Sequence, residues 1–186
     1  MDNGASSYRR FLEGDDSGLV EIIRDYKDGL IFYLNSLVNN LHIAEELAED
    51  TFVRLGTKKP RDKRKSSFKT WLYTIGRNLA IDYIRRESRI VQIPWEDHPE
   101  LYDDWPGIEA FFLRDERKAI VHRGLNNLSP DYRQVLWLTY FEQFSNREIA
   151  AVMKRSVRSI ETLVYRARKS LKQVIEKEGF IYEELC

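Results

Sequence analysis

This sequence of 186 residues has a single cysteine, Cys186, and only three histidines. A single cysteine excludes an intramolecular disulfide framework, and this composition is typical of a protein of the reducing cytoplasm. The first ten residues lack a basic start followed by an apolar run, so they predict no secretory signal peptide. No apolar stretch reaches the length of a membrane span, and we therefore expect no membrane insertion.

Residue patterns that support catalysis are also missing. His42, His98 and His122 are scattered along the chain without the spacing of metal ligands. The acid pairs at 15–16 and 103–104 lie in expected turn or linker sequence, where capping and solvation account for them. Neither a phosphate-binding glycine loop nor a nucleophile elbow is found. We expect no catalytic residues, no metal and no cofactor, and an enzyme is the least favoured class of protein.

Charge is unevenly distributed although the formal net charge is zero. Residues 54–65 contain seven Lys or Arg and one acid, and residues 154–172 contain the same numbers. Between them, residues 96–110 contain six acids and no Lys or Arg. Because a phosphate backbone responds to the local field, the two basic blocks indicate nucleic-acid binding despite the neutral sum.

The hydrophobic pattern predicts an all-α protein. Apolar residues recur every three or four positions, and no alternation typical of a strand is found. Asp15, Asp16 or Ser17 is expected to cap the first helix, while Gly56 and Pro60 are expected to end the second. Ser145 and Glu148 have the spacing of a capping box. The expected helices cover 19–41, 43–55, Ser66 or Ser67 to 86, 111–125, a segment opened by Ser129 and Pro130, one from Ser145, and 156–178, ended by Gly179.

The periodicity breaks in residues 87–110, where Pro94, Pro99 and Pro106 cannot occupy a helix interior. We therefore predict two small helical domains, 1–90 and 111–186, joined by a flexible acidic, proline-containing linker at 91–110.

Residues 145–171 predict a helix-turn-helix with a tight turn at 154–156. Ile149, Ala150, Val152 and Met153 would pack against Val157, Ile160 and Val164. Four polar residues would then face outward and read base edges: Arg158, Ser159, Glu161 and Thr162. Four basic residues would contact phosphates: Arg155, Arg166, Arg168 and Lys169. The alternative is a solvated basic helix, with Arg158 and Glu161 as an intrahelical ion pair.

The predicted helix near 67–86 carries cationic and aromatic residues after a basic loop. Asn78, Asp82 and Arg85 share one face, Arg77 and Arg86 lie beside it, and Trp71 and Tyr73 stand near the start. Such a mixture suits single-stranded DNA, where bases stack and phosphates are neutralised. In the alternative, Trp71 belongs to the core and Asp82–Arg86 is an exposed salt bridge.

Helix 43–55 carries an acidic patch that would repel DNA and suit a basic protein partner: Glu45, Glu46, Glu49 and Asp50. An ordinary solvated helix face is the alternative.

Three segments resemble extracytoplasmic-function (ECF) sigma factors. FKTWLYTIGRNLAIDYIRR at 68–86 resembles the promoter-melting segment of that family, and AEELAEDTF at 44–52 resembles the helix that grips the polymerase β′ clamp helices. LNNLSPDYRQVLWLTYFEQFS at 125–145 and the helix-turn-helix at 145–171 resemble the domain that reads the minus-35 element. The resemblance covers about 8–86 and 111–178, which would be sigma region 2 within 1–90 and sigma region 4 within 111–186.

The resemblance implies a transcription initiation protein that binds core RNA polymerase, reads the minus-35 and minus-10 elements and opens the DNA. The implied partners are the β′ clamp helices and β flap of the polymerase, promoter DNA and an anti-sigma factor. The loop at 56–67 would capture a flipped minus-10 base, and the acidic linker would run through polymerase channels. Glu45, Glu46, Glu49 and Asp50 would contact polymerase.

The full expected DNA-binding sets combine the resemblance with the residue patterns. The minus-35 set is Arg155, Ser156, Arg158, Ser159, Glu161, Thr162, Tyr165, Arg166, Arg168 and Lys169. The minus-10 set is Lys63, Arg64, Lys65, Ser66, Trp71, Tyr73, Arg77, Asn78, Arg85 and Arg86. Three positions depart from the family: Glu49 replaces the usual Gln, Lys154 the usual turn Gly, and Leu163 a frequent Arg.

The alternative from another functional class is a one-component helix-turn-helix regulator with a helical sensing or dimerisation domain. Such a regulator would bind its operator tightly without polymerase, whereas a sigma factor would bind DNA weakly on its own.

The expected contacts of Arg158 and Arg168 predict different mutant behaviour. Arg158→Ala should weaken binding by about 1–3 kcal/mol and relax specificity at one base position, because a bidentate contact to guanine is lost. Arg168→Ala should weaken all sequences alike and flatten the salt dependence. DNA titrations at several salt concentrations check both expectations, and a uniform loss in both variants would contradict the assignment of the reading face.

Overall fold

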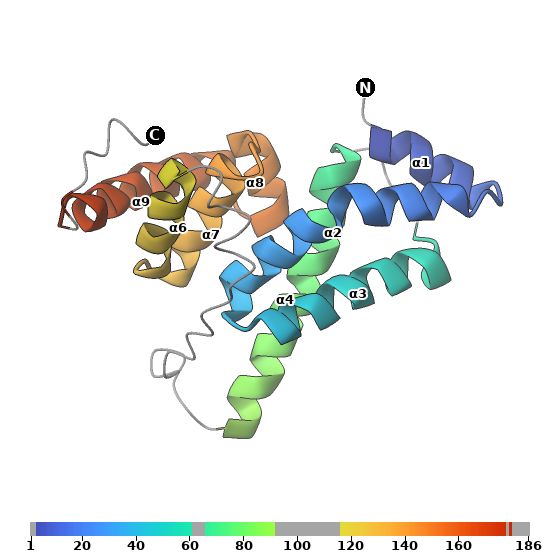
Figure 1. The fold of residues 1–186 in the computed structure, drawn as a ribbon, viewed down its shortest axis with the longest axis horizontal. Helices are drawn as coiled ribbons and strands as arrows, with labels where there is room; N and C mark the ends of the chain where they lie inside the picture. Colours follow the sequence, from blue (N-terminus) through green and yellow to red (C-terminus); the bar gives the residue numbers. More distant parts are fainter. Residues whose placement is uncertain (1–2, 61–65, 92–115, 178, 180–186) are drawn as a thin grey trace. The chain divides into compact units, whose positions relative to one another are not determined.

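The computed structural model describes residues 3–60, 66–91, 116–177 and 179, and these described residues form helices and no strand. The predicted all-α class is therefore confirmed. The helices are α1 (Asn3–Leu12), α2 (Ser17–Val38), α3 (Leu41–Lys58), α4 (Phe68–Val91), α6 (Glu116–Asn126), α7 (Pro130–Tyr140), α8 (Asn146–Met153) and α9 (Val157–Lys177) (Figure 1).

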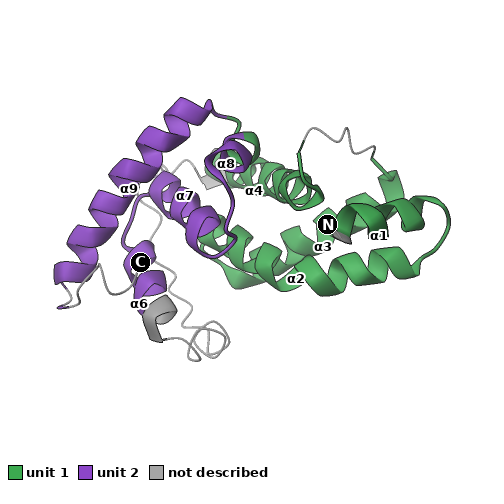
Figure 2. Cartoon of the chain, turned by 90° about the horizontal axis from the view of Figure 1, so that it is seen from above, with its two compact units in different colours: residues 1–101, 151–154 green, residues 102–150, 155–186 purple. Residues whose placement is uncertain are grey.

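The chain divides into two compact units (Figure 2). One comprises residues 1–101 with 151–154, and the other comprises residues 102–150 and 155–186. The predicted acidic linker at 91–110 lies outside the described residues except for Val91, with which α4 ends.

The first unit is built around α2, α3 and α4, which pack on one another. The apolar spacing in the predicted helix at 43–55 puts six residues on one side, and all six are buried in α3: Ala44, Leu47, Ala48, Thr51, Phe52 and Leu55. From α2, Leu30 and Leu34 are fully buried. The approach of α4 is close at Gly76, where an added Cβ would lie 3.0 Å from Leu30 Cδ1. Small and apolar residues at helical spacing therefore place α4 directly against α2.

Helix α1 was not expected from the sequence, because its ten residues carry few apolar side chains. It packs on α2 and α4. Gly18 permits this approach, since a Cβ there would lie 2.2 Å from the backbone oxygen of Ser7. Tyr8 and Phe11 are the large side chains that α1 buries, at 3% and 5% exposure.

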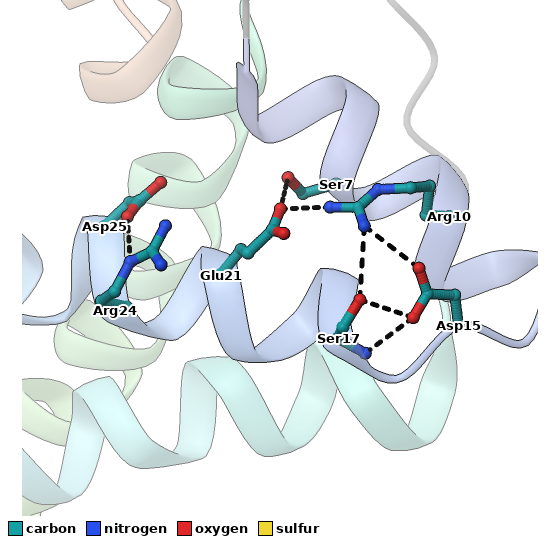
Figure 3. Close-up of polar contacts among 7 residues, drawn as sticks. All are labelled: Ser7, Arg10, Asp15, Ser17, Glu21, Arg24 and Asp25. Atoms are coloured by element: carbon teal, nitrogen blue, oxygen red, sulfur yellow. Dashed lines mark hydrogen bonds and ion pairs between the residues drawn. The ribbon is translucent and has the colours of Figure 1, made fainter.

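A polar network fastens α1 to the start of α2 (Figure 3). Arg10 pairs with Glu21 and, over 3.1 Å, with Asp15, while Ser7 donates to Glu21 over 2.7 Å. Asp15 also accepts from the backbone N–H of Ser17, the first residue of α2, over 3.0 Å, whereas the N-cap residue Asp16 makes no side-chain capping bond. These contacts lower the pKa of Glu21, mainly through its bond from Arg10, and the pKa of Asp15, mainly through its bond from Ser17.

Three predicted helix ends were wrong. Helix α2 ends at Val38 and not at Leu41, since Asn39 is left-handed with φ 51° and Leu41 already begins α3. Helix α3 continues through Gly56 to Lys58, and Lys59 closes it with a left-handed φ of 42°. Helix α4 continues to Val91, so residues 87–91 are helical although they were assigned to the break in periodicity. No proline occurs between Phe68 and Pro94, so nothing in the local sequence stops α4 earlier. The expected start is confirmed, since Ser67 Oγ accepts from the N–H of Thr70 over 3.2 Å.

The second unit packs α6 and α7 against α9. Leu171 and Ile175 of α9 are fully buried, and a Cβ at Gly124 of α6 would lie 2.9 Å from Leu171 Cδ1. Arg133 of α7 donates to three carbonyls at and just after the end of α6, those of Leu125, Asn126 and Leu128. Because the last carbonyls of a helix lack partners within it, this guanidinium stabilises the α6–α7 connection.

His122 lies in this unit with its ring edge-on to Trp137, at 5.7 Å between centroids. Burial lowers the pKa of His122 to about 4, and the cations Arg133 and Arg123 add to the effect. Between pH 6.5 and about 4, His122 therefore stays unprotonated in the folded chain but binds a proton in the unfolded chain. Its contribution to stability is present above pH 6.5 and is lost as the pH falls towards 4.

We expect the unfolding free energy of the second unit to fall by about 2 kcal/mol between neutral pH and pH 5 because of His122. His122→Gln should remove this part of the pH dependence, whereas His42→Gln, at an exposed histidine of α3, should leave it unchanged. Urea unfolding of each variant at both pH values measures the difference. If the unfolding free energies of the wild type and His122→Gln changed equally between the two pH values, the assignment of this pH dependence to His122 would be contradicted.

Candidate nucleic-acid interface

The predicted helix-turn-helix is formed by α8, the turn at 154–156 and α9. A reciprocal capping box opens α8: the N–H of Ser145 donates to Glu148 Oε2 over 3.0 Å, and the N–H of Glu148 donates to Ser145 Oγ over 3.3 Å. Ile149, Ala150, Val152 and Met153 are buried as expected. The local sequence therefore determines where this motif starts.

The turn itself has a left-handed residue. Lys154 has φ 54°, and the N–H of Arg155 donates to the carbonyl of Ala150 over 3.0 Å. Ser156 Oγ accepts from the N–H of Ser159 over 3.2 Å and so caps α9. A lysine at positive φ is less stable than a glycine there, because its Cβ strains the backbone in this conformation.

Helix α9 has a buried stripe and an exposed face. The buried residues recur at three- and four-residue steps: Ile160, Val164, Ala167, Leu171 and Ile175. Val157 was expected in this stripe, but it is 40% exposed, because α9 begins at this residue. The helix is therefore held from Ile160 onward, which leaves its first three residues exposed.

All ten residues of the expected minus-35 set lie on the turn or on α9, and all are exposed. Tyr165 is the most exposed large apolar residue there, at 71%. Thr162 Oγ1 donates to the carbonyl of Arg158 over 3.0 Å. The ion pair considered between Arg158 and Glu161 is not formed among the described side chains.

Two of the cationic residues have partners within the second unit. Arg155 donates to Asp131 Oδ2 at the start of α7 over 2.6 Å. The guanidinium of Arg168 lies 5.8 Å from the centre of the Tyr140 ring. Asp131 and Tyr140 restrict the rotamers of these arginines. Nothing in the local sequence around Asp131 or Tyr140 indicated that they would contact the arginines.

The expected minus-10 residues are only partly gathered on α4. Lys63, Arg64 and Lys65 lie outside the described residues. Arg85 and Arg86 are exposed, whereas Ser66, Arg77 and Asn78 are partly buried. The Asp82–Arg86 salt bridge that was considered is not formed in the described part of α4. Arg85 and Arg86 therefore present two exposed cations in the C-terminal half of α4, with the exposed Asp82 on the same half.

The two aromatic residues expected in this set differ. Tyr73 is 1% exposed and packs on Tyr33, with 5.3 Å between ring centroids, so it belongs to the core and cannot stack on a base in this conformation. Trp71 is partly exposed and lies in an aromatic cluster with Tyr8 and Phe68, at 5.3 and 5.7 Å. The i and i+2 spacing of these residues placed them on different sides of α4.

The acidic residues of α3 are on its outer side. Glu46, Glu49 and Asp50 are exposed, and Glu45 lies 4.0 Å from His42 Nδ1. Val53, one turn further along, is 58% exposed. The patch thus combines three exposed carboxylates with an apolar residue, which suits a protein partner better than DNA.

Among the residues that the structure describes, no group of acidic, His or Cys side chains could hold a metal ion. No described helix is long and apolar enough to cross a membrane.

Two protein-family models match the chain. Sigma-70 region 2 matches residues 22–90, and Sigma-70 region 4 matches residues 118–171. Each matched segment lies largely within the helices described above.

Several relatives match over most of this chain. SigM of Bacillus subtilis, an ECF RNA polymerase sigma factor, is 26% identical over 157 residues, which are 84% of this chain and 94% of SigM. The RNA polymerase sigma factor YlaC of the same organism is 29% identical, over 84% of this chain and 91% of YlaC. SigE of Mycolicibacterium smegmatis is 27% identical, and there the match spans 86% of this chain but 62% of the relative.

Two solved structures have a similar fold. The sigma factor RpoE in complex with the anti-sigma factor NepR, from Bartonella quintana, has a TM-score of 0.64 and 27% identity, over 84% of this chain and 95% of that chain. CnrH in complex with the cytosolic domain of CnrY has a TM-score of 0.63 at 21% identity, over 94% and 96%, which shows the fold alone.

The left-handed turn predicts opposite effects of two substitutions at Lys154. Lys154→Gly should stabilise the second unit by about 0.5–1 kcal/mol, because glycine adopts positive φ without strain. Lys154→Val should destabilise it by about 1–2 kcal/mol, because a β-branched residue is strained there. Thermal unfolding followed by circular dichroism measures both. A change of the same sign in both variants would show that charge rather than backbone conformation governs this position.

Proposed function

This chain belongs to the sigma-70 family as an extracytoplasmic-function sigma factor, and from that membership we propose which of its residues act in transcription initiation. The chain binds core RNA polymerase and directs it to promoters. Members of this family are regulatory proteins, and we propose that it has no catalytic residue of its own. We also propose that it acts in the cytoplasm, where RNA polymerase is.

We propose that residues within 1–90 form region 2, that 91–110 is the connecting linker and that 111–186 contains region 4. For region 4, the proposal is supported mainly by the two faces of α9. One face is buried, and the other is exposed and polar and begins at the N-terminus that Ser156 caps. Arg158, Ser159, Glu161 and Thr162 would reach base edges of the minus-35 element. The flanking residues would contact phosphates or sugars: Arg155, Ser156, Tyr165, Arg166, Arg168 and Lys169.

The restrained arginines support this assignment of roles. A phosphate contact needs a cation held in register rather than a group that selects among bases. Arg155 is held by Asp131, and Arg168 by the Tyr140 ring. Arg158 has no such restraint among the described side chains, so it can adjust to the edge of a base pair.

For region 2, we propose that α4 and the segment before it meet the minus-10 element as single-stranded DNA. Arg85 and Arg86 would neutralise phosphates, and Trp71 would offer a ring edge near the unpaired bases. Arg77, Asn78, Ser66 and the basic residues Lys63, Arg64 and Lys65 complete this proposed set. Tyr73 is left out because it is buried.

We propose that the acidic face of α3 binds the β′ clamp helices of core polymerase. Glu45, Glu46, Glu49 and Asp50 would meet basic side chains, and Val53 would add apolar contact at the edge. Region 4 would meet the β flap, and an anti-sigma factor is a further proposed partner, since both similar structures are complexes. The one-component regulator is not favoured, because it would need neither region 2 nor this face.

We expect sequence-selective DNA binding to depend on core polymerase. A gel shift with promoter DNA should show weak binding by the protein alone and a specific complex when core is added. The promoter is first identified by sequencing the transcripts that core makes with this protein. Tight operator binding without core would instead establish the one-component regulator.

The polymerase face is tested in the same assay by Glu49→Lys. Charge reversal should weaken core binding about tenfold or more, because complementary charges become repulsive. Glu13→Lys provides the matched control, since Glu13 is also exposed, in the turn between α1 and α2. Equal effects of the two variants would point to net charge and not to a contact at α3.

A further inference from the structure

Helix α1 contacts both ends of the connection between α3 and α4, and Tyr8 makes the contact. Its hydroxyl donates to the carbonyl oxygen of Pro60 over 2.7 Å, just after α3 ends. Its ring lies 5.6 Å from Phe68 and 5.3 Å from Trp71, in the first turn of α4. Two segments separated by several residues in the sequence are therefore held by one buried side chain.

A second aromatic residue of α1 acts on the same end of α3. Lys59 Nζ lies 4.7 Å from the centre of the Phe11 ring, a cation–π distance. Lys59 is the left-handed residue that ends α3, so its side chain direction is set by the backbone there. Phe11 thus restrains the first basic residue beyond α3, next to the carbonyl that Tyr8 holds.

Helix α1 is itself fixed, so it can act as a rigid support. Its backbone lies directly on α2 at Gly18, and Arg10 and Ser7 both bond to Glu21 (Figure 3). At its other end, a Cβ on Gly4 would lie 2.3 Å from Phe68 Cδ1. A movement of α1 would therefore be transmitted to Pro60 and to the first turn of α4 together.

We propose that Tyr8 is a positioning residue for reading the minus-10 element. It holds Lys59–Pro60 and Trp71 in one arrangement, so that groups on both sides of the connection meet unpaired bases in register. The proposal rests on the proposed function of region 2. Tyr8 itself is 3% exposed and does not contact DNA. A displacement of about 1 Å between a side chain and a bound base can abolish a polar contact. Loss of the Tyr8 hydroxyl should therefore lower base selectivity at the minus-10 element while the protein still folds.

The test is Tyr8→Phe, which removes the hydrogen bond to Pro60 and retains the aromatic packing. Core polymerase with each variant transcribes a library randomised at both promoter elements, and the recovered transcripts are sequenced. Discrimination between preferred and other bases at minus-10 should fall about 2- to 10-fold, the range that one hydrogen bond allows. Discrimination at minus-35 should be unchanged and serves as the internal control.

Two further variants separate positioning from general destabilisation. Tyr26→Phe changes a tyrosine of α2 that packs on the same Phe68 ring at 5.7 Å, and it should retain wild-type discrimination. Gly18→Ala forces α1 away from α2 and should reproduce the loss seen for Tyr8→Phe at minus-10 alone. Both variants are checked for native helicity by circular dichroism and for core binding.

The proposal is overturned if Tyr8→Phe discriminates at minus-10 as the wild type does, or if both elements lose discrimination in equal proportion. The latter result would assign Tyr8 to stability alone. Failure of the proposed function would look different, since core with wild-type protein would then recover no preferred sequence at either element.

Discussion

The burial of one apolar face of each long helix is the constraint on which the rest of this structure depends. Five aliphatic or small residues along α9 are buried, and each fully buried Leu or Ile contributes about 1.5–3 kcal/mol. In a unit with only three or four helices, few such residues can be replaced. The opposite face of α9 does not contribute to this apolar packing, and it carries the cations and polar groups proposed for DNA. Helix α3 follows the same rule, with a buried apolar face and an acidic outer one.

Small residues decide how closely these faces approach. Gly76 brings α4 onto α2, Gly18 brings α2 under α1, and Gly124 brings α6 onto α9. At Gly18 the neighbour is backbone, which cannot rotate away, so a larger residue there requires a shift of a whole helix. The positions of the proposed interfaces thus depend on glycines that have no contact with a ligand.

Restraint of long cationic side chains is a second theme. Arg155 pairs with Asp131, Arg168 lies over Tyr140, and Lys59 lies over Phe11. Each partner limits the rotamers of a flexible side chain before any phosphate is bound. A restrained cation loses less conformational entropy on binding, which favours contacts that position the protein on DNA.

Much of the fold and of the region 4 site was determined by the sequence itself. Helical spacing predicted the buried residues of α3 and α8, because a period of 3.6 residues leaves a direct trace in the chain. In α9 it predicted Ile160 and Val164, whereas Ala167, Leu171 and Ile175 were not singled out. The capping box at Ser145 and Glu148 set the start of α8 by purely local hydrogen bonds. Only the tertiary structure decided the rest. It buried Tyr73 and left Trp71 partly exposed, extended α3 through Gly56, and placed the poorly apolar α1 against α2 and α4. These outcomes depend on contacts between residues far apart in the chain, such as Tyr8 with Pro60, and no local pattern encodes such contacts.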